Sequence, residues 1–110
     1  MPRAYQPTPH ALTVTNATRC ADLVRIAGAV VLSPDLLERG YADLWYAYAH
    51  AERTARALRA KGRCEAAGKW QERADSYRIA RAALWAELVR RGLRTEAPYV
   101  GVRLLPNPAG

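Results

Sequence analysis

The feature that most constrains the fold is a seam of apolar and small residues that recurs every three or four positions between residues 37 and 88. Before Gly62 the seam consists of Leu37, Tyr41, Leu44, Tyr48, Ala51, Ala55 and Leu58. After Gly62 it consists of Ala67, Trp70, Ala74, Tyr77, Arg81, Leu84 and Leu88, with Trp85 beside it. This spacing puts the seam on one face of a helix, and neither helix can bury its face alone. We therefore predict two long helices, 34–62 and 64–92, that fold back on each other as an antiparallel helical hairpin.

The ends of these two helices carry recognisable signals. Ser33 can cap a helix that begins at Pro34, because proline suits the first helical position. Gly62 and Gly92 can take the left-handed conformation that commonly follows the last turn. Gly40 lies inside the first helix, where a kink or a break is an alternative.

The rest of the chain predicts one more helix and two extended ends. Apolar spacing predicts a shorter third helix over 17–31, capped by Thr15 or Asn16 and packed across the hairpin. Prolines at positions 2, 7 and 9 indicate an extended arm over 1–15, and 93–110 is predicted as an extended tail. Residues 11–15 could instead pair with 99–105 as a small ribbon. The predicted fold is a single all-α domain over 1–110.

The charge balance favours an anionic partner. Lys and Arg number 17 against 10 Asp and Glu, which gives a net charge of +7. Arginine abundance from a GC-rich genome is the alternative source of this excess. The longest apolar run, 26–32, is far shorter than the roughly 20 residues of a membrane span, and no secretory signal is recognisable. We therefore expect a soluble cytoplasmic protein without a membrane partner.

Catalytic and metal motifs are incomplete. The segment GRCEAAGK at 62–69 has one residue too many for a phosphate-binding P-loop, and Trp70 stands where that loop needs a hydroxyl. The four candidate zinc ligands, His10, Cys20, His50 and Cys64, contain no closely spaced pair. We expect no enzyme activity, no cofactor and no metal.

A run of cations surrounds the predicted bend. We call six residues the basic cluster: Arg53, Arg56, Arg59, Lys61, Arg63 and Lys69. Its first three arginines and Arg63 fall within a sector of about 120° on a helix, which suits a row of phosphates or carboxylates. An ordinary solvated helix face is the alternative. No aromatic residue is interleaved in 53–63, so backbone contact is the expected mode if nucleic acid is bound.

Aromatic residues of the first long helix give the remaining candidates. Trp45 and Tyr46 are possible anchors for a partner protein. Arg81 occupies a seam position, so we expect it to extend toward solvent, to pair with an acid or to stack on one of its predicted neighbours, the rings of Tyr41, Trp45 and Tyr48. A role in a binding groove is the alternative.

These observations lead to two hypotheses of function. In the first, the protein docks without catalysis on a partner protein or complex that handles nucleic acid, as a regulator or inhibitor, such as an accessory factor of a mobile element. In the second, the basic cluster binds DNA or RNA backbone directly, without sequence preference. Formation of a homodimer is a further hypothesis, because a helical hairpin often completes its core as a four-helix bundle.

Overall fold

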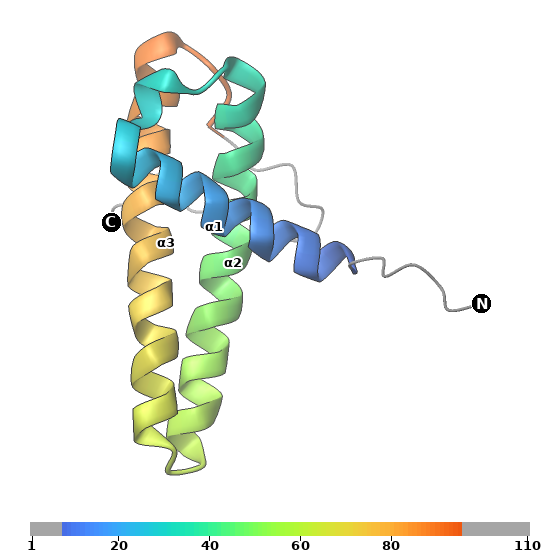
Figure 1. The fold of residues 1–110 in the computed structure, drawn as a ribbon, viewed down its shortest axis with the longest axis vertical. Helices are drawn as coiled ribbons and strands as arrows, with labels where there is room; N and C mark the ends of the chain where they lie inside the picture. Colours follow the sequence, from blue (N-terminus) through green and yellow to red (C-terminus); the bar gives the residue numbers. More distant parts are fainter. Residues whose placement is uncertain (1–7, 96–110) are drawn as a thin grey trace, which may run out of the picture.

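The computed structural model describes residues 8–95, which form three α-helices and one short 3₁₀ turn. The elements are α1 (Pro9–Ala27), η1 (Ala29–Val31), α2 (Pro34–Ala60) and α3 (Cys64–Arg91). Helices α2 and α3 lie antiparallel as a long hairpin, and α1 lies across both of them (Figure 1). The all-α prediction of a hairpin crossed by a third, shorter helix is confirmed.

The connection between α2 and α3 is a tight turn at Gly62. Gly62 has φ +75°, in the left-handed region that a side chain disfavours. The N–H of Arg63 donates to the carbonyl of Leu58 at 2.9 Å, and that of Gly62 donates to Arg59 at 3.0 Å. These hydrogen bonds satisfy two of the last carbonyls of α2 where the chain reverses direction.

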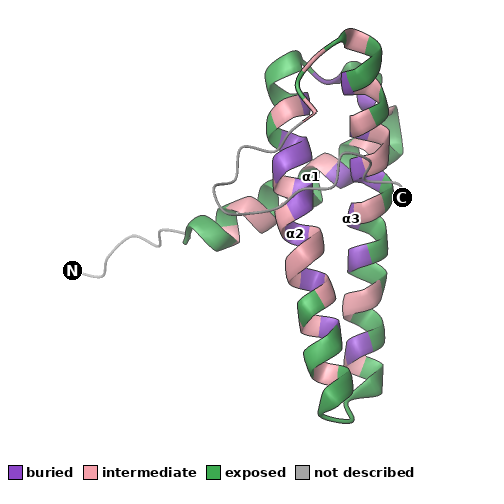
Figure 2. Ribbon diagram, turned by 180° about the vertical axis from the view of Figure 1, so that it is seen from behind, coloured by how far each residue is buried: buried purple, intermediate pink, exposed green. Residues whose placement is uncertain are grey.

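The predicted seam forms the core of the hairpin. Figure 2 shows buried residues along α2 and α3, and exposed residues at the bend, at the opposite end of the hairpin and on the outer sides of the helices. Alanines at positions 51, 55, 67 and 74 are fully buried, so the two helices can approach closely next to the bend. Tyr41, Leu44, Leu84 and Leu88 fill the wider part of the core toward the other end. No described helix combines the length and apolar character that crossing a membrane requires.

The predictions for the N-terminal part of the chain were wrong in three respects. Residues 9–15, assigned to an extended arm, belong to α1, so they cannot form a ribbon with 99–105. The cap is Thr8, whose hydroxyl accepts from the N–H of Ala11, and Pro9 follows as the first helical residue. The helix ends at Ala27 and not at residue 31, because Gly28 has φ +84°. Residues 1–7 and the predicted C-terminal tail beyond Thr95 lie outside the described residues.

Gly40 brings α1 close to the hairpin. Helix α2 continues through Gly40 without a break, contrary to the alternative considered from the sequence. A Cβ atom at this position would lie 2.6 Å from the sulfur of Cys20 and 3.1 Å from a methyl group of Leu84. The missing side chain therefore lets α1 pack against α2 with the small residues Ala17, Cys20 and Ala21.

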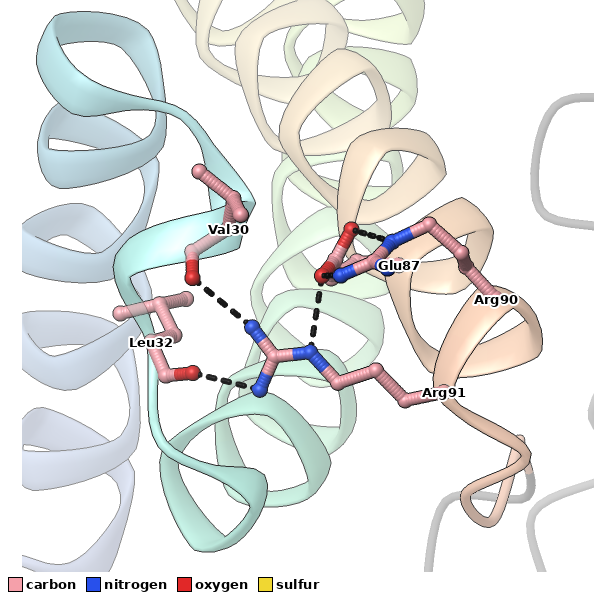
Figure 3. A network of polar contacts seen from close by, with 5 residues as sticks. All are labelled: Val30, Leu32, Glu87, Arg90 and Arg91. Atoms are coloured by element: carbon pink, nitrogen blue, oxygen red, sulfur yellow. Dashed lines mark hydrogen bonds and ion pairs between the residues drawn. The ribbon is translucent and has the colours of Figure 1, made fainter.

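A network of polar contacts fixes the open end of the hairpin to η1 (Figure 3). The Arg91 guanidinium donates to the carbonyl oxygens of Leu32 and Val30, each at 2.8 Å, and to Glu87 at 2.8 Å. Arg90 also pairs with the Glu87 carboxylate. Charge-assisted hydrogen bonds to two arginines lower the pKa of Glu87 to about 2.

Candidate functional site

The bend places the six cations of the basic cluster at one end of the molecule. All six side chains are exposed, three on the last turns of α2, two in the turn and one on α3. Among residues 8–95, Glu52 is the one carboxylate within 4 Å of a cluster cation, 3.9 Å from Arg56. Arg59 donates to the side-chain oxygen of Gln71 at 3.3 Å and remains exposed. The cluster is therefore largely free to meet an external anion.

The start of α3 adds partial positive charge beside these cations. Within the described part of the chain, no side chain caps the first N–H groups of α3, whose N-cap residue is Arg63. A hollow of about 610 Å³ lies there, lined by Gly62, Arg63, Cys64, Glu65, Ala66 and Lys69. Glu65 is the carboxylate in this lining, so cations predominate at the bend.

Trp45 is not available as an anchor, which corrects the expectation from the sequence. Its side chain is only 9% exposed. The Arg81 guanidinium lies 3.8 Å from the centre of the Trp45 ring and 4.3 Å from that of Tyr48. Stacking on these two rings, one of the arrangements expected for Arg81, is thus confirmed, and this stack makes Trp45 part of the core. Burial of Arg81 also lowers the pKa of its guanidinium.

Tyr46 belongs instead to a row of aromatic rings that the sequence did not reveal. We call His10, Tyr46, His50 and Trp70 the aromatic strip. The ring of His10 lies 5.4 Å from that of Tyr46 and 4.5 Å from that of His50, measured between ring centres. His50 in turn lies 5.4 Å from Trp70, so the strip joins α1, α2 and α3. Tyr46, His50 and Trp70 are half-buried and His10 is exposed.

The aromatic strip is bordered by cations. The guanidinium of Arg73 lies 4.6 Å from the centre of the Trp70 ring. Burial, together with the nearby His10 and Arg53, lowers the pKa of His50. The sequence could not predict this arrangement, because it depends on His10 being part of a helix that crosses the hairpin.

A second surface feature lies far along α2 from the bend. A groove of about 230 Å³ lies on the surface beside α1 and the start of α2, and it is lined by Asn16, Arg19, Cys20, Leu23, Leu32, Leu36, Arg39, Gly40 and Asp43. Leu23 and Leu36 are about half exposed there, and Ile26 and Val30 are more exposed on the same part of the chain. Burial raises the pKa of the Cys20 thiol to about 11, which keeps it protonated and unreactive at neutral pH.

In the described part of the chain, no three His, Cys, Asp or Glu side chains gather in a way that could hold a metal ion. Comparisons of the chain with models of protein families, with curated proteins and with solved structures found no significant match. The candidate sites therefore rest on geometry and charge: the basic cluster, the aromatic strip and the apolar groove.

Proposed function

We propose that the protein is a non-enzymatic cytoplasmic binding protein that contacts nucleic-acid backbone through the basic cluster, without reading sequence. The observation that carries this proposal is the exposure of all six cations at the bend. Within residues 8–95 they form one ion pair, between Arg56 and Glu52 at 3.9 Å. Cations that are not already neutralised by the fold can replace counterions along a phosphate backbone, and the release of those counterions drives binding.

The shape of the bend supports backbone contact over reading of base edges. Two helices packed side by side measure about 20 Å across. The major groove of B-DNA is only about 12 Å wide and admits a single helix. The hairpin end is therefore too broad to enter the groove, whereas its arginines can reach phosphates from outside.

A charge-matched comparison of two variants tests this proposal. One variant combines Arg56→Gln, Arg59→Gln, Lys61→Gln and Arg63→Gln at the bend. The control combines Arg19→Gln, Arg25→Gln, Arg39→Gln and Arg94→Gln, four exposed arginines outside the basic cluster. Both lose the same net charge, so a difference between them reports the position of the charges.

Binding is measured by fluorescence anisotropy with labelled random DNA, single-stranded and duplex, at about 50 mM salt. We expect the bend variant to bind at least about tenfold more weakly than the control. Equal weakening by the two variants, or no binding by the unaltered protein, would contradict the proposal.

The apolar groove favours a second candidate, docking on a protein or complex that handles nucleic acid, as a regulator or inhibitor. Leu23, Leu32 and Leu36 line the groove, and Arg19, Arg39 and Asp43 form polar positions in the same lining. An apolar centre with charged residues around it is the usual composition of a protein interface. Leu36→Glu should abolish capture of a partner from nuclease-treated lysate, while the bend variant retains it. Capture of nothing except species bridged by nucleic acid would exclude this candidate.

A further inference from the structure

The aromatic strip and the basic cluster are neighbours on the hairpin. Arg53 belongs to the basic cluster and is close enough to His50 to lower the pKa of its imidazole. Lys69 precedes Trp70 in the chain, and Arg73 lies against the Trp70 ring. The strip therefore extends the cationic surface of the bend along the hairpin to the first turn of α1.

The charged groups that act on His50 are cationic. His50 is affected by His10 from α1 and by Arg53 from α2, both of which oppose its protonation. From α3 it meets the Trp70 ring, whose face carries Arg73. Phosphate groups passing beside these rings would thus meet cations on more than one helix.

Aromatic rings beside cations suit one class of anionic ligand best. In single-stranded DNA or RNA the bases are free to stack on protein side chains, whereas in a duplex they are stacked on each other. Stacking tolerates any base, because every base has a flat face. A surface that combines partly exposed rings with Arg and Lys is typical of proteins that bind single strands without sequence preference.

We propose that the aromatic strip binds unpaired bases, so that the preferred ligand of this surface is single-stranded nucleic acid. The backbone lies along Arg53, Lys69 and Arg73, and the bases contact the exposed parts of His10 and Trp70. This inference rests on the proposed binding of nucleic acid by the basic cluster and adds the class of ligand.

Two single substitutions and one control test the proposal. Trp70→Leu removes the largest ring of the strip, and His10→Ala removes an exposed ring from the first turn of α1. Trp85→Leu makes the same chemical change as Trp70→Leu at a half-buried position nearer the open end of α3, outside the strip. Circular dichroism on heating establishes that each variant folds, and the exposed position of His10 makes His10→Ala informative even if Trp70→Leu fails to fold.

The probes are labelled oligothymidylate of roughly 20 nucleotides and a duplex of the same length, compared by anisotropy. We expect Trp70→Leu and His10→Ala to weaken oligothymidylate binding roughly tenfold and to change duplex binding less than about twofold. Trp85→Leu should change neither. Equal effects on both probes, or no effect of either strip variant, would overturn the proposal while leaving the role of the basic cluster intact. Failure of the unaltered protein to bind either probe would instead overturn the proposed function itself.

Tryptophan fluorescence supplies a second readout at the strip. Base stacking on Trp70 should quench part of the protein emission when oligothymidylate is added, and this quench should vanish in Trp70→Leu but persist in Trp85→Leu. Quenching of the same size in Trp70→Leu would show that the bases lie elsewhere.

Discussion

A methyl group at position 40 would collide with α1. Alanine normally stabilises a helix interior by up to about 1 kcal/mol relative to glycine. At Gly40 the added carbon would meet the Cys20 sulfur at 2.6 Å and Leu84 at 3.1 Å, so α1 or α3 must shift. Overpacking of this kind costs about 1 to 3 kcal/mol.

We predict that Gly40→Ala lowers the free energy of unfolding by about 1 kcal/mol, measured by urea denaturation. Gly68→Ala is the matched control, because Gly68 lies within α3 and an added methyl group there would meet nothing within 4 Å among residues 8–95 beyond its chain neighbours and the nearby helix backbone. That change should raise stability by about 0.5 to 1 kcal/mol. Stabilisation by both changes would mean that α1 does not pack on Gly40.

A substitution at Arg81 can test whether the planar shape of its guanidinium group contributes to stability. Arg81 is only 3% exposed, and its guanidinium lies over the rings of Trp45 and Tyr48. Lysine keeps the charge but cannot stack as a plane. We predict that Arg81→Lys lowers the free energy of unfolding by about 1 kcal/mol in urea denaturation. Stability unchanged by this substitution would show that the stack contributes nothing beyond charge.

Among the elements, η1 is fixed to the end of α3 by the Arg91 guanidinium, which the Glu87 carboxylate of the same helix holds in place. The pKa of Glu87 is about 2 in the folded protein, below the ordinary glutamate value of 4.5 that applies to the unfolded chain. A carboxyl group whose pKa is lower in the folded state stabilises the fold above its unfolded pKa. This contribution is lost as the pH falls from about 4.5 toward 2.

We predict that Glu87→Gln flattens the loss of stability over this pH window, as measured by thermal denaturation at a series of pH values. At neutral pH the same variant should be less stable than the unaltered protein, because glutamine cannot form the ion pairs with Arg90 and Arg91. Identical pH profiles for the two proteins would show that the network contributes nothing to stability.

The sequence predicted the hairpin because its signals are local. Seam spacing, the Ser33-Pro34 start and the glycines at 62 and 92 each act within a few residues of where the structure uses them. Thr8-Pro9 is the same kind of start as Ser33-Pro34, but the surrounding prolines and β-branched residues led to the prediction of an extended arm. Helix α1 is held mainly by tertiary contacts with Gly40 and the core, which no local pattern reveals.

At the scale of the whole molecule, the hairpin separates two surfaces of different chemistry. The basic cluster occupies the bend, which is the lower end of the hairpin in Figure 1, and the apolar groove lies beside α1 and the start of α2. The cluster could be predicted because its residues are adjacent in sequence. The aromatic strip could not be predicted, since its four rings come from three helices and meet only after α1 crosses the hairpin.

The salt dependence of binding to oligothymidylate reports on contact between the bend and the phosphates, because it counts the cations that release counterions. For about six cations on a single strand, the slope of log K against log salt is predicted to be about −4. In the bend variant, which lacks four of these cations, the slope should decrease in magnitude by about 3. A slope near zero, or the same slope in both proteins, would show that the cations at the bend do not meet the phosphates.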